Sequence, residues 1–203
     1  MNEVTMTWKG LCPLIMHNNV SANPRSIEAK TMKSLTSKRN KTDEDHEEIG
    51  RLEWESGLYL YDGDLVIPER VVWATMYGAA KKNRNGVKVK SGLFLNELNY
   101  PLSHNGKKWK VDKDETFPRE SLNPVYNSGE FIYGSIVKVS AARVYRTRPI
   151  FNPPWSIDNI VFEYDPSILN EREIIQIAEV AGKIVGLCEQ RPQMGRFKVE
   201  VVK

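Results

Sequence analysis

The end of the sequence combines glycines and arginines at a spacing that could bind phosphate. A run with helical periodicity stops at Gly186, and Gly195 lies between Arg191 and Arg196, directly before a strand-like segment. Glycine adopts left-handed backbone conformations without steric cost, and arginine presents planar, always-charged donors that suit phosphate. The segment therefore predicts a phosphate-facing loop. A plain helix-to-strand connection with two solvated arginines is the alternative.

Other basic residues could neutralise the backbone of a nucleic acid. Beyond the terminal loop, the candidates for phosphate binding are Lys38, Arg39, Lys81, Lys82, Arg84, Arg146 and Arg148, with Lys88 and Lys90 in support. Because side chains alternate along a strand, Arg146 and Arg148 can share a face that Arg143 cannot join. Charge runs of this kind also occur as ordinary solvated surface.

Aromatic residues could stack on unpaired bases, as they do in proteins that bind single strands. Tyr145 and Trp155 are the candidates for stacking, and Phe151 and Trp109 are further aromatics of the same kind. The alternative for each is a place in the core or the anchoring of a loop.

His17 is a candidate general base, because a histidine can transfer protons near neutral pH. No serine, tyrosine or lysine is tied to it by spacing, so a structural histidine in a loop is the alternative. His46 and His104 are the other two histidines. No metal site, P-loop or dinucleotide fingerprint is present in the sequence, so we expect no metal and no cofactor, and a binding protein rather than an enzyme.

Length and composition are typical of one intracellular domain. The 203 residues are enough for a sizeable core, and the net charge of +3 excludes a strongly polycationic protein. Cys12 and Cys188 lie among apolar neighbours, which favours free thiols in a reducing compartment. No secretion signal or membrane-spanning run is found, so we expect a cytoplasmic protein that does not enter membranes.

The N-terminal part predicts a strand followed by an excursion. Residues 4–16 first alternate and then form an apolar run, which predicts a central strand with a bend. Residues 18–41 are polar and basic, as in an exposed loop or loose helix. Thr42 and Asp45 form a capping-box pair at the start of a helix that Gly57 ends.

A hairpin and a helix follow. The Asp62-Gly63 dipeptide lies between the apolar runs of residues 58–67 and favours a tight type I′ turn. Pro68 then begins a helix, because proline is favoured in the first helical turn. Residues 83–130 are irregular and rich in Lys, Asn, Gly and Pro, which predicts an insertion or loop system.

The C-terminal third predicts strands at residues 136–145 and 157–164, a helix at 170–185 and a last strand at 197–202. Asn170 and Glu173 form a capping pair at the start of this helix. With the first strand and the Pro68 helix, the order is β-α-β-β-α-β. The fold class we expect is therefore α+β, with a ferredoxin-like (RRM-type) core and an antiparallel sheet. The whole chain would be one domain, with insertions at about 18–57 and 83–130.

Three segments are similar to the RAMP superfamily of CRISPR-associated proteins, particularly its Cas7-like members. They are residues 10–15 (GLCPLI), residues 66–70 (VIPER) with the helix end at 78–81 (GAAK), and residues 186–199 (GLCEQRPQMGRFKV). The last resembles the glycine-rich loop and strand of that superfamily. The resemblance implies an RRM-like core that binds RNA, often as a repeated subunit. The small size is typical of a stand-alone phage or mobile-element member.

The leading hypothesis is a non-catalytic protein that binds RNA or single-stranded DNA and forms a homo-oligomer. One alternative is a metal-independent, Cas6-like endoribonuclease that uses His17. Another is a phage anti-defence protein that binds a nucleotide signal or a protein partner. The sequence does not choose between RNA, DNA and a nucleotide ligand.

Overall fold

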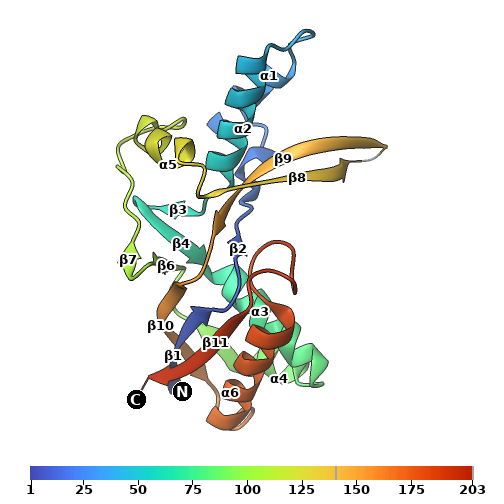
Figure 1. Ribbon diagram of the computed structural model, residues 1–203. Helices are drawn as coiled ribbons and strands as arrows, with labels where there is room; N and C mark the ends of the chain where they lie inside the picture. Colours follow the sequence, from blue (N-terminus) through green and yellow to red (C-terminus); the bar gives the residue numbers. More distant parts are fainter. Residues whose placement is uncertain (140, 203) are drawn as a thin grey trace. The chain divides into compact units, whose positions relative to one another are not determined.

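The computed structural model describes residues 1–139 and 141–202, which form a mixed α+β protein with a mostly antiparallel sheet (Figure 1). The chain folds into two compact units, each of which is described by itself. Unit 1 comprises Met1–Leu14, Asp64–Lys110 and the chain from Phe151 onward. Unit 2 comprises Ile15–Gly63 and Val111–Ile150.

The main sheet of unit 1 is antiparallel. Along the sheet, its strands lie in the order β11 (Phe197–Val202), β1 (Asn2–Gly10), β10 (Trp155–Tyr164), β6 (Asn99–His104) and β4 (Asp64–Pro68). Two short strands extend it, since β5 (Leu93–Leu95) pairs with β10 and β7 (Lys107–Lys108) pairs with β6. The first strand of the chain is therefore central, as predicted, and its neighbours are the last strand and β10.

Aromatic packing fixes the centre of this sheet. Trp8 is fully buried and stacks on Phe197 with ring centroids 4.2 Å apart, and it also stacks on Phe162 at 6.0 Å. These three rings come from β1, β11 and β10, so one cluster joins the three adjacent strands. Stacked rings of this kind stabilise a core beyond the apolar area that they bury.

Helix α3 (Glu69–Lys82) follows β4 directly. Pro68 is its N-cap rather than its first helical residue, one position earlier than predicted. The face of Val72, Met76 and Ala79 is buried, as the helical spacing predicts. This burial places the basic end of the helix at the surface.

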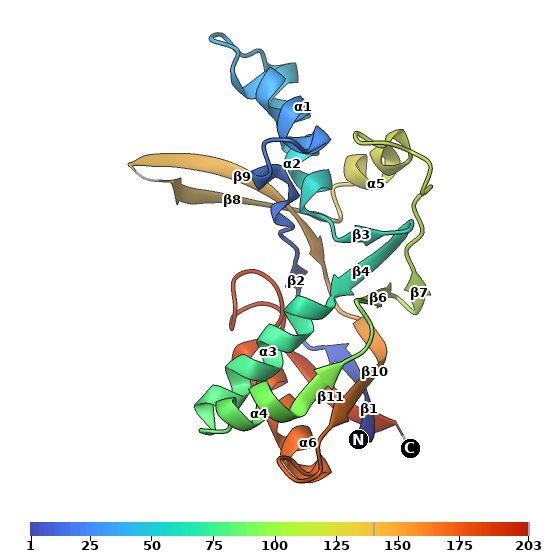
Figure 2. The same cartoon turned by 180° about the vertical axis from the view of Figure 1, so that it is seen from behind.

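Helix α6 (Glu171–Val180) begins with the predicted capping box. The side chain of Asn170 accepts a hydrogen bond from the Glu173 N–H at 3.0 Å, and the Glu173 carboxylate accepts one from the Asn170 N–H at 3.0 Å. A π-helical turn (Ala181–Val185) follows. Helices α3 and α6 contact each other and lie on one side of the unit 1 sheet (Figures 1 and 2). Helix α4 (Gly86–Gly92) packs beside α3.

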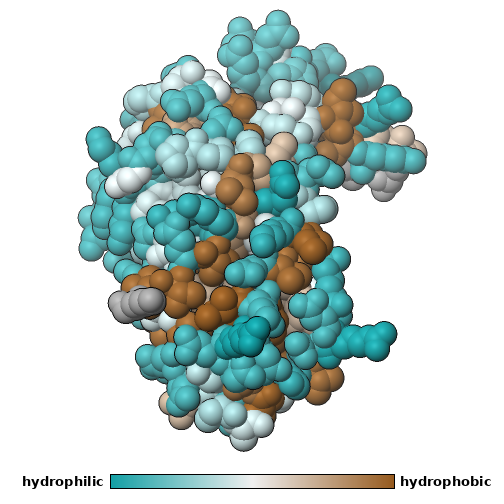
Figure 3. Space-filling model, turned by 60° about the horizontal axis from the view of Figure 1, so that its bottom comes forward, coloured by the Kyte–Doolittle hydropathy of each residue, from teal (hydrophilic) through white to brown (hydrophobic). Residues whose placement is uncertain are grey.

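Strand β11 is an edge strand within the described part of the chain. Its outer residues Val201 and Val202 are 38% and 43% exposed, and Figure 3 shows hydrophobic side chains gathered beside this end of the chain. Lys198 and Glu200 lie on the same strand and form an ion pair at 2.9 Å. Charged side chains on an edge strand discourage pairing with other sheets.

Unit 2 combines a three-stranded sheet with helices. The strands lie in the order β2 (Leu14–Ile15), β9 (Ala142–Phe151) and β8 (Ile132–Val139). The helices are η1 (Asn19–Ala22), α1 (Ile27–Thr36), α2 (Asp43–Gly57), η2 (Glu120–Leu122) and α5 (Asn123–Asn127). Helix α2 begins with the predicted capping box of Thr42 and Asp45. Strand β3 (Leu60–Tyr61) ends at the turn of Asp62 and Gly63, both of which have the positive φ that a type I′ hairpin requires.

Two expectations about strands differ from the structure. The segment 136–145 is not one strand, because it spans the end of β8 and the start of β9, which pair with each other. The irregular region 83–130 contributes α4, β5, β6 and β7 to unit 1, and η2 and α5 to unit 2. Strand β6 pairs with both β10 and β4.

None of the helices in the described part of the chain has the length and apolar character needed to span a bilayer.

A buried carboxylate ties the η2–α5 segment to α2. Glu55 is 2% exposed, and its side chain accepts hydrogen bonds from the Arg119 main-chain N–H at 3.0 Å and from the Arg119 guanidinium at 3.1 Å. Arg51 lies 3.5 Å from the same carboxylate. Burial raises the pKa of Glu55, while Arg119 and Arg51 act in the opposite direction. The two arginines therefore compensate a desolvated charge.

Replacing Glu55 by alanine should lower the free energy of unfolding by about 3 kcal/mol, because it leaves the partly buried Arg119 without its counter-ion and Arg51 with only the more distant Glu48. Glu48→Ala is the matched control, since Glu48 pairs with the same Arg51 at 3.8 Å but its side chain is 44% exposed. That substitution should cost less than about 1 kcal/mol. Urea denaturation of both variants measures the difference, and equal losses would contradict the structural role of Glu55.

Candidate functional site

The terminal loop of unit 1 is closed by its own backbone. The Leu187 N–H donates to the Gly195 carbonyl oxygen at 2.9 Å. The Gly195 N–H donates to the Pro13 carbonyl oxygen at 2.7 Å. The N–H of Met194 donates to Gln190 O at 3.0 Å. The N–H of Arg196 donates to the Cys12 sulfur at 3.1 Å. These four donors are already used, so they do not form a cradle of free N–H groups for a phosphate.

The two glycines behave as predicted. Gly186 and Gly195 have φ angles of +77° and +72°. A Cβ at Gly195 would lie 2.8 Å from the Leu187 nitrogen and closer still to its carbonyl oxygen. Glycine is therefore required at this position both by the backbone conformation and by the close approach of Leu187.

The arginines of this loop are on the surface. Arg191 and Arg196 are exposed and form no ion pair within residues 1–139 and 141–202. Burial of the Cys188 sulfur raises the pKa of its thiol to about 12, which the charge of Arg191 only partly offsets. The loop thus offers two cations on a rigid, internally bonded backbone.

The basic residues at the end of α3 are also exposed. Lys81, Lys82 and Arg84 lie at the last turn and just beyond it, and the Lys81 ammonium lies 4.4 Å from the centre of the Tyr77 ring. Lys88, a supporting candidate, pairs with Glu173 at 2.8 Å. Local partners therefore engage two of these lysines, while Lys82, Lys90 and Arg84 stay at the surface of unit 1.

The prediction that Trp155 stacks on bases is wrong. Its side chain is 1% exposed, and its indole N–H donates to the Cys12 carbonyl oxygen at 2.8 Å. The ring lies over Gly10, where any Cβ would overlap it. Phe151 is also fully buried, with Trp109 packed edge-on against it at 5.1 Å. Trp155 and Phe151 are therefore core residues of unit 1, whereas Trp109 is only partly buried.

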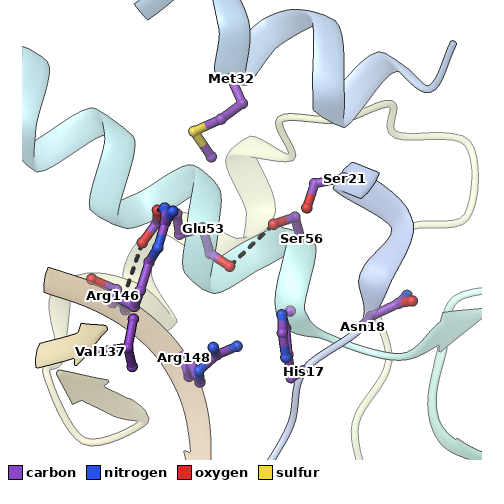
Figure 4. A pocket seen from close by; sticks show the side chains of 11 residues that line it. His17, Asn18, Ser21, Met32, Glu53, Ser56, Val137, Arg146 and Arg148 are labelled. Atoms are coloured by element: carbon purple, nitrogen blue, oxygen red, sulfur yellow. Dashed lines mark hydrogen bonds and ion pairs between the residues drawn. The ribbon is translucent and has the colours of Figure 1, made fainter. Parts of the chain in front are cut away.

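A cavity of about 310 Å³ in unit 2 brings three predicted residues together. Arg146, Arg148 and His17 line it, and Figure 4 shows their side chains around the opening, with Arg146 joined to Glu53. The remaining lining residues are Asn18, Ser21, Met32, Ser56, Gly57, Val137 and Thr147. Helices α1, α2 and η1, the hairpin β8–β9 and the segment after β2 each contribute to the wall.

The register of the β8–β9 hairpin explains why the two arginines meet. Arg146 is paired with Ser135 and Arg148 with Tyr133, so both lie on one face of the hairpin. Arg143, paired with Lys138, lies on the other face. The period-two argument from the sequence is confirmed for all three arginines.

Glu53 holds β9 against α2, and no sequence motif indicates this role. Its carboxylate pairs with Arg146 and also accepts the Thr147 N–H at 3.1 Å. Gly57, four residues later on α2, allows the close approach, since a Cβ there would lie 2.7 Å from Pro149 Cδ. The sequence predicted Gly57 only as a helix stop; contact with β9 is its further role.

The charges of the cavity favour an anion. Glu53 balances Arg146, whereas Arg148 forms no ion pair with any residue of the described chain. His17 adds a ring that can accept or donate a hydrogen bond. One excess guanidinium beside a half-exposed Arg146 suits a phosphate group, because arginine binds phosphate oxygens through two donors at once.

Lys38 and Arg39 lie outside this cavity. Lys38 pairs with Asp45 at 2.6 Å at the start of α2, so its charge is locally balanced. Arg39 is exposed in the turn between α1 and α2. Both stay predictions as backbone-neutralising residues.

Tyr145 is exposed, in contrast to Trp155. It is 64% exposed on the hairpin face that carries Arg143 and Lys138, and it pairs across the strands with Ile136, which is 69% exposed. The ring crosses Gly134 on β8, where a Cβ would overlap the phenol. The hairpin therefore carries an aromatic surface beside two cations on one face and two cavity-lining arginines on the other.

A scan against protein-family models finds no match for this chain, and a search of curated proteins finds none that is significantly similar. Among the described residues, no cluster of three His, Cys, Asp or Glu side chains could hold a metal ion. The function therefore has to be argued from the site itself.

Replacing Gly195 by alanine tests the closed loop. The added Cβ would meet Leu187, and the positive φ would be strained, so we expect the free energy of unfolding to fall by more than about 2 kcal/mol. Gly106→Ala in the same unit is the control, because Gly106 has a φ of +73° but nothing lies within 4 Å of its Cβ position. Thermal unfolding should show the larger loss for Gly195→Ala; the reverse order would refute the close approach.

Proposed function

We propose that unit 2 binds RNA or single-stranded DNA through the β8–β9 hairpin and the cavity behind it. The observation that carries the proposal is the convergence of Arg146 and Arg148 on one cavity that contains a single carboxylate. Phosphate contacts supply most of the affinity of such proteins. The exposed Tyr145 supplies a platform on which a base can stack.

We also propose a ferredoxin-like core for unit 1, and with it the relationship to RAMP-type, Cas7-like proteins. Along the chain, β1, α3, β6, β10, α6 and β11 follow the order strand-helix-strand-strand-helix-strand. Strand β10 lies between β1 and β6, the split arrangement typical of that core. Support for the relationship is the closed glycine loop between α6 and β11, at the position where the resembling segment lies.

Replacing Arg148 by glutamine tests binding by the cavity. Arg148 lacks an ion pair in the described chain, so the change removes one charge without exposing a buried partner. Affinity for a labelled single-stranded oligonucleotide should fall, and the slope of log affinity against log salt should decrease by about 0.7. Fluorescence anisotropy across a salt series measures both.

Arg25→Gln is the matched control, because Arg25 is an exposed arginine of unit 2 outside the cavity. It removes the same charge and should leave affinity and slope close to those of the unchanged protein. Equal losses of affinity in the two variants would mean that binding depends on overall positive charge and not on the cavity. If the unchanged protein showed no salt-dependent binding, the result would contradict the proposal.

Cleavage of the bound strand is a second candidate function, favoured by one observation. His17 lines the same cavity as the two arginines. A histidine can act as a general base on a ribose hydroxyl while guanidinium groups stabilise the phosphate charge. This chemistry requires no metal, so it would proceed in the presence of EDTA.

Incubating the protein with labelled RNA in EDTA tests cleavage. The products should appear with the unchanged protein and not with His17→Ala, while both proteins bind the RNA. His104→Gln is the control, because His104 lies in unit 1 and lines neither cavity of unit 2. RNA that stays intact with the unchanged protein would leave unit 2 as a binding module without nuclease activity.

A further inference from the structure

We propose that a second cavity in unit 2, on the opposite face of β9 from the arginines, binds one unpaired nucleobase. This inference rests on the proposed binding of single-stranded nucleic acid and specifies how a base would be held. The cavity has a volume of about 360 Å³. Its walls include Ile49 and Gly50 from α2, Tyr126 from α5, Ile132 from β8 and Tyr145 from β9.

The alternation of β9 separates the two cavities. Arg146 and Arg148 point into the first, and Tyr145 lines the second from the other face, while Thr147 and Glu53 border both. A strand of nucleic acid crossing the hairpin would therefore meet guanidinium groups on one face and an aromatic, apolar surface on the other. Guanidinium groups bind phosphates, and an aromatic, apolar surface stacks on bases.

Two glycines keep this second surface open. A Cβ at Gly50 would lie 3.2 Å from the Tyr126 hydroxyl oxygen and 3.3 Å from the Thr147 hydroxyl oxygen, so any side chain at this position would occupy the cavity. Gly134 lets the Tyr145 ring lie across β8. The cavity is thus shaped by the absence of side chains on two separate elements.

The Tyr126 ring in the wall is supported by a buried ring. Tyr126 packs edge-on against Trp54, which is fully buried, with ring centroids 5.5 Å apart. Burial raises the pKa of Tyr126, and the nearby carboxylate of Glu47 adds to this effect, so the phenol stays neutral. A neutral phenol can donate to an acceptor on the edge of a base.

The cavity wall contains the carboxylates of Glu47 and Glu53, so the cavity suits a neutral base rather than a phosphate, and the cations that would meet the phosphates lie beside it. On the face of Tyr145, the next cross-strand pair along the hairpin is Lys138 and Arg143, both exposed. Two cations beside an aromatic platform suit a base that is linked to phosphates. The Ile136 side chain, directly opposite Tyr145, extends the apolar surface.

An abasic oligonucleotide separates this inference from the proposed function. We expect the unchanged protein to bind a normal single strand about tenfold more tightly than an abasic strand of the same length and charge. Tyr145→Ala should remove this difference by weakening only the binding of the normal strand. Tyr145→Phe, which keeps the ring, should retain most of it.

Tyr61→Ala is the control, because Tyr61 is a comparably exposed tyrosine of unit 2, at 59%, and does not line the cavity. Circular dichroism should show that each variant is folded. Equal affinity for the normal and abasic strands would overturn the base site and leave the arginine cavity supported. Failure to bind either strand would overturn the proposed function itself, and tight binding of an aromatic peptide instead would overturn the assignment to a base.

Discussion

The attachment of β9 to α2 by Glu53 is the interaction on which the candidate site depends. Its carboxylate accepts a main-chain N–H of β9 and pairs with Arg146, so it fixes both the position of the strand and the direction of one side chain. Gly57 lets the end of the helix approach that strand. Because a strand alternates with period two, holding it in this way fixes which residues face each of the two cavities.

Glu53 also sets the electrostatic character of the site. A carboxylate among arginines reduces their attraction for anions, but it compensates the desolvation of Arg146 and leaves Arg148 as the excess charge. Glu55, two residues later, anchors a different segment through Arg119 and Arg51. Helix α2 thus has two nearby carboxylates with separate roles: Glu53 positions the strand that lines the cavity, and Glu55 holds the segment that contains Arg119.

Local signals in the sequence predicted much of the fold. Both capping boxes, the Asp62-Gly63 turn and the alternation of Arg146 and Arg148 depend on residues close together in the chain. The pairing of Glu53 with Arg146 joins residues 93 positions apart and has no local signature. Trp155 was misassigned for the same reason, because the space that buries it is provided by Gly10 at the start of the chain. Strand β6 was missed because Pro101 and polar residues hide its alternation.

The two units differ in how they use aromatic and basic residues, and this difference favours unit 2 as the ligand-binding part. In unit 1 the rings of Trp8, Trp155 and Phe197 are buried, although Phe94 is 42% exposed. Four N–H groups of the terminal loop of unit 1 donate hydrogen bonds within the chain, so they stabilise the loop. In unit 2 an exposed tyrosine crosses a glycine, and two arginines line an open cavity. A ring held at the surface contributes little to stability, because it buries little apolar area. Its position beside Arg143 and Lys138 agrees with the proposed contact with a ligand that has both a planar and a negatively charged part.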